Sequence, residues 1–300
     1  HHQLTFQFKL NNGNGLVHLL YQITLHIICA TWSHLKHKSG AWVILVSFQR
    51  KRSKRKHIYA IALLDHVQIT ISDTVSDNSC NTCRISCGCP HPDNIVIAAE
   101  IERLGKAGVV VVTYNSDLPD STRVCHVGQD LMKSGKIAAG LMARSLSPKD
   151  RILLITGNME FRSHRVRIDG FLEHLKTLGF PSDSYDLKEC YEQYELTYDA
   201  VRQAVDAFPN LHGIYMGTEH VKACVDALAK TRRRMTVVVN DLTPVARHAL
   251  KIGAVDFVVE QDFTAQVRQA ILLQKHLLYG RTVRRPIVHV QTSIVTRELL

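Results

Sequence analysis

The 300-residue chain has no long uninterrupted run of apolar residues. The nearest candidate, VHLLYQITLHIICA at residues 17–30, is shorter than the roughly 18 residues that span a bilayer, and polar side chains interrupt it. We therefore expect no membrane segment.

Several catalytic signatures are also missing. The sequence contains no glycine-rich phosphate loop, no HExxH, no GxSxG and no evident nucleophile–base pair. Glu219 and Asp241 could in principle form a carboxylate pair for glycoside hydrolysis, but nothing in the sequence brings them together. We expect a protein that is not an enzyme and holds no cofactor.

Glutamate is absent from residues 1–99, where ordinary usage would supply about six. The same segment holds four aspartates, nine of the 17 histidines and five of the eight cysteines. From Glu100 onward the composition is that of an ordinary α/β protein, so the net charge of +10 is unevenly placed. We treat residues 1–92 as an atypical segment. It either forms part of an N-terminal lobe or is not native to the fold, for example because it is translated out of frame.

Two groups of residues allow more than one interpretation. The cysteines of CNTCRISCGC could bind zinc, although structural zinc sites generally use two well-separated pairs. RKRSKRKH at 50–57 could contact nucleic-acid phosphates, but a solvated charge run is the simpler interpretation, and KTRRR at 230–234 suits the end of a helix. We predict no metal site at Cys80, Cys83, Cys87 and Cys89, and buried reduced thiols at Cys125, Cys190 and Cys224.

From residue 93 the chain alternates between Val/Ile-rich runs and amphipathic stretches, a pattern typical of parallel sheets covered by helices on both faces. Before that point AWVILVSFQ at 41–49 and IYAIALL at 58–64 could be strands. The pattern predicts strands at 109–114, 123–127, 151–156, 184–188, 211–216, 235–239 and 255–259. It predicts helices at 96–107, 130–146, 163–178, 195–207, 219–230, 243–252 and 263–279.

Polar residues follow five of these strands, at the edge where parallel sheets bind ligands. Amide, carboxylate and guanidinium groups together suit a polyol, since each hydroxyl both donates and accepts hydrogen bonds. The alternative is that they are helix caps and turn residues. In chain order, the residues that follow the five strands are Asn115, Ser116 and Asp117; Gly157 and the arginines after it; Gly217, Thr218 and Glu219; Asn240 and Asp241; and Glu260, Gln261 and Asp262.

The stretch NMEFRSHRVRIDGF at 158–171 places cationic side chains in the first turns of a predicted helix, where the macrodipole disfavours them. A ligand or a partner elsewhere in the fold must neutralise them. Arginine is neither a cap nor a turn former, so we assign Arg165 to the ligand. We expect Arg167, at a different angle on the helix, to pair with Asp169 or another surface carboxylate.

Several segments resemble the effector-binding domain of lactose-repressor-type transcription regulators, which is similar to the type I periplasmic sugar-binding proteins. They are TYNSDLPDSTRVCHVGQDLMKSGKIAAGLM (113–142), SHRVRIDGF (163–171), VVVNDLTP (237–244), EQDF (260–263) and TSIVTREL (292–299). The resemblance covers about residues 93–300. It implies ligand contacts at Asn115, Ser116, Arg165, Thr218, Asp241 and Gln261.

The resemblance also implies two doubly wound α/β lobes joined by three crossovers, near 123–128, 259–263 and 286–292, with a sugar or related polyol between the lobes. The N-terminal lobe would comprise 93–125 and 262–286, and the C-terminal lobe 126–261 and 287–300.

A regulator of this type would be a cytoplasmic homodimer, with operator DNA as partner if a DNA-binding headpiece exists. The alternative is a periplasmic solute-binding protein of a transporter. It would need an export signal, and residues 1–15 lack the basic and then apolar order of one. We therefore expect the regulator.

Overall fold

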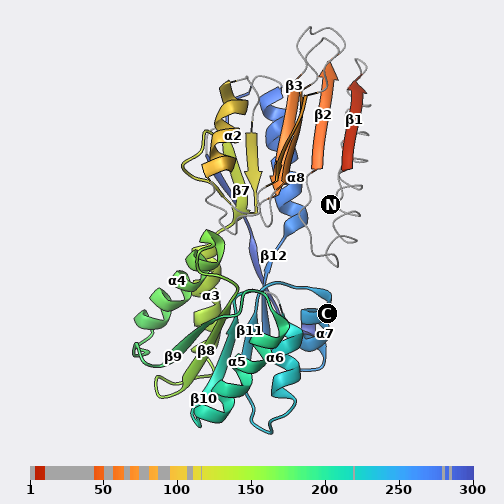
Figure 1. Cartoon of the computed structure of the whole chain (residues 1–300). Coiled ribbons are helices and arrows are strands. Elements are labelled where there is room, and N and C mark those ends of the chain that lie inside the picture. Colours follow the sequence, from red (N-terminus) through yellow and green to blue (C-terminus); the bar gives the residue numbers. More distant parts are fainter. Residues whose placement is uncertain are drawn as a thin grey trace. The chain divides into compact units, whose positions relative to one another are not determined.

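The computed structural model describes residues 4–10, 44–50, 57–63, 68–73, 81–86, 95–106, 111–115, 117–218, 220–278, 281–283 and 286–300, with backbone alone before residue 98. The chain divides into two compact units (Figure 1). The first comprises His1–Gly128 and Phe263–Val290, and the second Gln129–Asp262 and Gln291–Leu300.

The first unit contains a sheet with the strand order β1-β2-β3-β6-β7-β13. β2 pairs with β3 antiparallel, while β1–β2, β3–β6 and β6–β7 are parallel. The predicted strands at 41–49 and 58–64 correspond to β2 and β3. The strands are β1 (Leu4–Leu10), β2 (Ile44–Arg50), β3 (His57–Leu63), β6 (Val111–Tyr114), β7 (Cys125–Gln129) and β13 (Ile287–Val290), with a separate antiparallel pair of β4 (Gln68–Asp73) and β5 (Asn81–Ser86).

Helices α2 (Ile95–Lys106) and α8 (Phe263–Leu278) belong to the same unit. The buried side chains of β6 and β7 pack against α8, because their apolar residues meet the apolar stripe of that helix. This core contains Val112, Tyr114, Cys125, Val127, Val267, Ala270, Ile271 and Leu273.

The second unit contains the sheet β14-β12-β11-β10-β8-β9, in which only β14 runs antiparallel among the described strands. The prediction of parallel sheets therefore holds for five of its strands. The parallel strands are β8 (Arg151–Thr156), β9 (Tyr185–Glu189), β10 (Leu211–Met216), β11 (Thr236–Val239) and β12 (Phe257–Gln261). The antiparallel strand β14 (Thr292–Val295) is followed by the 3-10 turn η1 (Arg297–Leu299).

Both faces of this sheet are covered (Figure 1). Side chains alternate along each strand, so Ile152 and Leu154 join the core under α3 and α4, whereas Leu153 and Ile155 join the core under α5, α6 and α7. The helices are α3 (Leu131–Met142), α4 (Arg162–Thr177), α5 (Tyr194–Ala207), α6 (Val221–Leu228) and α7 (Pro244–Lys251).

α3 and α4 cross at two glycines. A Cβ atom at Gly135 would lie 2.0 Å from the carbonyl oxygen of Arg167, and one at Gly170 would lie 2.2 Å from the carbonyl oxygen of Met132. Real Cβ atoms do not approach this closely, so the two helix backbones require glycine at both positions. The contact sets the position of α4 on the sheet.

Some sequence predictions need correction. α3 ends at Met142 rather than at residue 146, and α6 spans fewer residues than predicted. KTRRR does not simply end a helix. Arg233 donates to the carbonyl oxygens of Val205, Phe208, Pro209 and Leu211 around the end of α5, and Arg234 binds Asp256. These arginines satisfy backbone and carboxylate acceptors that sequence spacing alone does not reveal.

The three cysteines predicted to be buried reduced thiols, Cys125, Cys190 and Cys224, are buried, and none of them is in a disulfide. Burial raises the pKa of the Cys224 thiol to about 12. The side chains of Cys80, Cys83, Cys87 and Cys89, like the run at 51–56, lie outside the described residues. No helix in the described part of the chain is long and apolar enough to cross a bilayer.

Candidate functional site

The carboxyl ends of β8, β10, β11 and β12 lie at one edge of the second sheet, because these strands are parallel. Four predicted site residues, Arg165, Thr218, Asp241 and Gln261, belong to the second unit and follow or end these strands. Asn115 belongs to the first unit, and Ser116 and Glu219 lie outside the described residues.

Asp241 and Gln261 are in direct contact. The amide Nε2 of Gln261 donates to Oδ2 of Asp241 over 2.7 Å, and Gln261 is buried. The other carboxylate oxygen of Asp241, Oδ1, is also buried and accepts no hydrogen bond from any residue that the structure describes. A buried carboxylate oxygen normally has a donor, so Oδ1 is an acceptor available to a bound molecule.

Asn240, the residue before Asp241, belongs to a buried hydrogen-bond network. The hydroxyl of Tyr215 donates to Oδ1 of Asn240 over 2.8 Å, and Nδ2 of Asn240 donates to Ser134 Oγ and to the carbonyl oxygen of Val259. The ring of Tyr215 stacks on Phe171 at a centroid distance of 4.7 Å. Each polar group named in this network has a partner, so we expect the network to be rigid.

The pKa of Tyr215 indicates which charges surround its hydroxyl. Burial raises the pKa well above its ordinary value, the positive charge of Arg167 opposes that rise, and the negative charge of Asp241 adds to it. Arg167 and Asp241 therefore both act on the same buried hydroxyl. Opposite charges flank this part of the strand edge.

Arg167 does not pair with Asp169 or a surface carboxylate, so that prediction was wrong. Its side chain is buried, and Nη1 donates to the carbonyl oxygen of Gly217 over 2.5 Å. Nε is buried and has no hydrogen-bond acceptor in the described part of the chain. Sequence spacing could have revealed this position, because Arg167 lies four residues before the buried Phe171 on the same helical face.

Arg165 lies two residues before Arg167, so its side chain leaves α4 at a different angle. Its Nη1 donates to the carbonyl oxygens of Met159 and Glu160, at 3.0 and 3.5 Å, in the loop before α4. The side chain is half-buried, so part of the guanidinium is tied to its own loop. The role of Arg165 as a ligand contact stays a prediction.

His164 is a neutral, half-buried neighbour of these two arginines. Burial, with the positive charge of Arg167, lowers its pKa to about 4. Nδ1 lies 3.1 Å from both the backbone nitrogen and the carbonyl oxygen of Asn158, and Nε2 lies 3.7 Å from Oε1 of Glu192. A neutral histidine forms no salt bridge with this glutamate. The positive charge at 158–171 is therefore smaller than expected from the sequence, because His164 does not contribute to it.

The β9–α5 turn lies beside His164 and contains two consecutive left-handed residues, Tyr191 (φ 48°) and Glu192 (φ 52°). Residues other than glycine rarely adopt this conformation, and such strain concentrates at functional sites. The amide of Tyr191 donates to the carbonyl oxygen of Gly157 over 2.8 Å, which ties the turn to the end of β8. The side chain of Tyr191 is 55% exposed and lies outside the core.

In the first unit, Asn115 follows β6 with φ 66°, and its backbone N–H donates to the carbonyl oxygen of Val127 over 3.0 Å. Nearby, Asp117 accepts hydrogen bonds from Arg123 and from Thr113, and the Thr113 hydroxyl lies 3.0 Å from Nδ1 of His126. Asp117 is thus paired within the protein. The simpler interpretation of a structural turn residue fits this aspartate.

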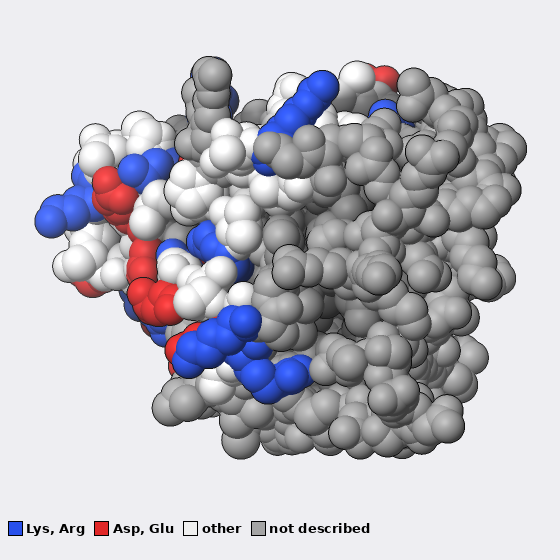
Figure 2. Space-filling model, turned by 90° about the horizontal axis from the view of Figure 1, so that it is seen from above, with Lys and Arg blue, Asp and Glu red and all other residues white. Residues whose placement is uncertain are grey.

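Glu260 also has a structural role, because its carboxylate accepts a hydrogen bond from the amide of Leu242. No group of three or more His, Cys, Asp or Glu side chains within the described residues is placed to hold a metal ion. On the face shown in Figure 2, the Lys and Arg side chains of the described residues lie in separate groups, some beside Asp and Glu. The described residues on that face form no continuous basic surface.

Comparison with known proteins places this fold. No curated protein sequence matches the chain. Among solved structures it is similar to a sugar ABC transporter sugar-binding protein from Bacillus halodurans, with 20% identity, a TM-score of 0.63 and coverage of 68% of this chain and 74% of the other.

Two further structures show the same fold. One is an ABC transporter solute-binding protein from Burkholderia graminis in complex with D-arabinose, with 21% identity, a TM-score of 0.61 and coverage of 67% and 72%. The other is GanP, a glucose-galactose binding protein from Geobacillus stearothermophilus, with 17% identity, a TM-score of 0.60 and coverage of 67% and 72%.

The two α/β units are those of the type I periplasmic binding proteins. The model of the periplasmic binding protein domain matches residues 92–282, which is more than half of the chain. This chain belongs to the periplasmic binding protein domain family.

Proposed function

We propose that this chain binds a sugar or related polyol at the carboxyl edge of the second sheet, as the solute-binding protein of a transport system. The observation that carries the proposal is the pair of buried polar atoms Arg167 Nε and Asp241 Oδ1, which have no partner among the described residues. One is a donor and the other an acceptor. A hydroxyl group satisfies both kinds of atom.

The roles of individual residues follow from their chemistry. Asp241 would accept from a sugar hydroxyl while Gln261 holds its second oxygen. Arg167 would donate to a hydroxyl or ring oxygen, with Arg165 and Thr218 beside it at the same strand edge. The roles of Asn115 and Ser116 as ligand contacts stay predictions.

The names of the similar structures support transport over regulation. All three are described as sugar-binding or solute-binding proteins, one with D-arabinose bound. A role of this kind implies a periplasmic location and no catalysis.

The second candidate is the effector domain of a lactose-repressor-type regulator. The segments SHRVRIDGF and TSIVTREL favour it through their resemblance to that family. That role would require a homodimer and operator DNA. Light scattering after size exclusion separates the two roles, because a strict monomer at micromolar concentration is not expected of the regulator.

Isothermal titration calorimetry tests the binding proposal directly. The panel would contain D-arabinose, D-glucose, D-galactose and D-ribose, with leucine as a ligand that lacks vicinal hydroxyls. We expect at least one sugar to bind with a Kd of about 1 mM or tighter. Heats no larger than dilution for every sugar in the panel, with a folded protein, would overturn the proposal.

A further inference from the structure

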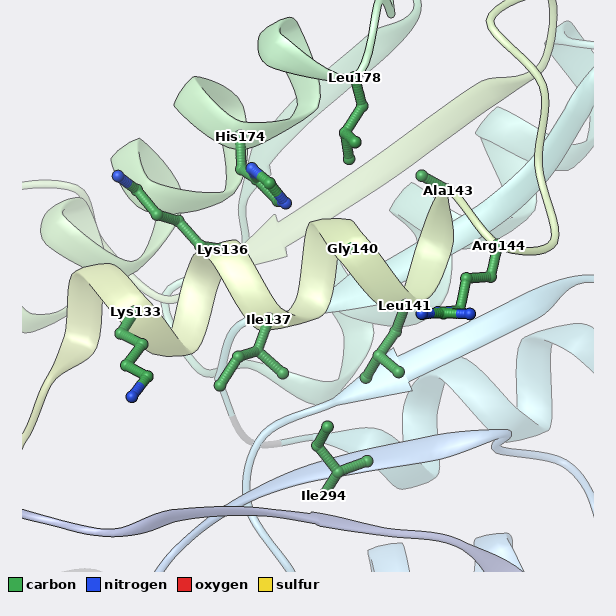
Figure 3. A pocket seen from close by; sticks show the side chains of 10 residues that line it. All are labelled: Lys133, Lys136, Ile137, Gly140, Leu141, Ala143, Arg144, His174, Leu178 and Ile294. Atoms are coloured by element: carbon green, nitrogen blue, oxygen red, sulfur yellow. The ribbon is translucent and has the colours of Figure 1, made fainter.

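The second unit has a groove of about 540 Å³ on the outer face of α3, apart from the strand edge described above. Figure 3 shows Ile294 of β14 pointing toward Ile137 and Leu141 of α3, with Lys133 and Arg144 at the two ends of this side of the helix. The volume is within the range of about 300–1,000 Å³ that is typical of ligand pockets. The groove is large enough to receive several side chains of a partner.

The groove residues along α3 follow a regular spacing. Lys133, Ile137 and Leu141 of α3 and Arg144, in the turn directly after the helix, are separated by four, four and three positions, which places them on one side of α3. Along this side of α3 the four side chains are basic, apolar, apolar and basic, over a length of about 16 Å. Ile294, on a strand at the edge of the sheet, is 41% exposed and widens the apolar centre.

The charge of the groove has one sign. Lys133, Lys136 and Arg144 line it, and no carboxylate does so among the described residues. Lys136 is bound by Glu173 at 3.0 Å and points toward α4. Lys133 and Arg144 are exposed and form no salt bridge with any part of the chain that the structure describes.

We infer that this groove docks an acidic amphipathic helix of a partner protein. Such a helix would place two apolar side chains against Ile137, Leu141 and Ile294, and a carboxylate near each of Lys133 and Arg144. A helix laid along α3 reproduces the spacing of these contacts, because both helices share the same rise per residue. Opposite charges at the two ends then fix its register.

The surface is independent of the sugar site. It lies along the exposed face of α3, and none of Arg165, Arg167, Thr218, Asp241 or Gln261 lines it. A neutral sugar would leave both end charges without a partner. Failure of sugar binding would therefore leave this inference intact.

Fluorescence anisotropy on the full chain provides the test. The probe is a labelled helical peptide of about 18 residues. Two leucines one turn apart lie between two glutamates in this peptide, and the four residues have the spacing of Lys133, Ile137, Leu141 and Arg144. The comparison peptide has the same composition in scrambled order. The variants are Lys133→Glu/Arg144→Glu and Ile294→Ser, and Lys230→Glu/Lys251→Glu is the matched control, because it makes the same charge change at exposed positions of the same unit.

We expect the designed peptide to bind the wild-type chain, and both groove variants to weaken it by at least about tenfold, while the control double variant weakens it by less than about threefold. Circular dichroism of each variant must show an unchanged fold. The inference is overturned if the peptide does not bind at about 1 mM, if the scrambled peptide binds equally well, or if the groove variants bind like the control. Binding to vesicles of phosphatidylglycerol without binding to the peptide would also overturn it, since it would assign the groove to a membrane surface.

Discussion

Arg167 is bound to the carbonyl oxygen of Gly217 through Nη1 at 2.5 Å, which joins α4 to the end of β10. The contact places a buried guanidinium at the edge of the second sheet, next to the hydroxyl of Tyr215. A charge held in this way is positioned before any ligand arrives, so little side-chain entropy is lost on binding.

The first prediction compares the two arginines. Arg167→Met should weaken sugar binding by about 2–5 kcal/mol, because it removes a charge-assisted donor from a buried site. It should also lower the free energy of unfolding by about 1–3 kcal/mol, since the Gly217 carbonyl loses its partner. Arg165→Ala should weaken binding less, because part of that guanidinium is bound to its own loop. Calorimetry and urea denaturation measure both effects, and equal losses of affinity in the two variants would contradict the larger role of Arg167.

The second prediction concerns Asp241. Asp241→Asn keeps the size of the side chain but removes its charge, so the ligand hydroxyl loses a charged acceptor. We expect sugar binding to weaken by about 1.5–3 kcal/mol. Asp262→Asn is the matched control, because it makes the same charge change at an exposed carboxylate next to Gln261 in the sequence. Unchanged affinity of Asp241→Asn, measured by calorimetry, would remove this residue from the site.

The third prediction is a pH dependence of stability. The pKa of His164 is about 4 in the folded chain and 6.5 in its unperturbed state. Between these values the unfolded chain binds more protons than the folded chain, so the free energy of unfolding falls as the pH is lowered. Above about pH 6.5 this histidine does not lower the free energy of unfolding. Below that pH the free energy of unfolding falls progressively toward pH 4, by about 2 kcal/mol at pH 5.

Urea denaturation of wild type and His164→Gln at about pH 7 and about pH 5 isolates this effect. The variant should lose less stability over that interval than the wild type. His248→Gln, at an exposed position on α7, should keep the wild-type slope. The same slope in all three proteins would show that His164 does not titrate as described.

The fourth prediction uses the glycines of α3. Gly135→Ala should destabilise the chain by about 2–3 kcal/mol, because its Cβ would be 2.0 Å from the Arg167 carbonyl oxygen. Gly140→Ala on the same helix meets its nearest atom at 3.6 Å, so helix propensity should stabilise it by up to about 1 kcal/mol. Thermal denaturation distinguishes the two, and similar melting temperatures would contradict the close crossing of α3 and α4.

The fifth prediction concerns residues 1–92. Glutamate is absent through residue 99, and the family model matches from residue 92. We predict that much of this segment is encoded out of frame. Independent sequencing reads of the gene should show an insertion or deletion near the codon for residue 92. An uninterrupted frame in those reads would refute the prediction.

Much of the fold could be predicted from residue 93 onward, because strands such as RILLIT are apolar on both faces and the helices between them are amphipathic. Element ends were less predictable. The helix predicted over 130–146 stops at Met142, where no proline or glycine marks the end. The antiparallel direction of β14 depends on its pairing with β12, a long-range contact that local pattern does not encode.

The arrangement of the candidate site residues was predictable only in part. Asp241 and Gln261 were proposed because polar residues follow parallel strands, and the structure places the two in contact, while their roles as ligand contacts stay predictions. Arg167 was assigned to a surface carboxylate because it lies at a different angle on the helix from Arg165. Its partner is a backbone carbonyl fifty residues away, and no local sequence feature indicates such an acceptor.

Calorimetric titration of one sugar into wild type, Arg167→Met and Asp241→Asn tests the central claim most directly, because it measures whether the two buried, unpartnered atoms bind a hydroxyl-bearing ligand. The account predicts saturable binding by the wild type and a loss of at least about tenfold in each folded variant. Equal sugar affinity in all three proteins would contradict it.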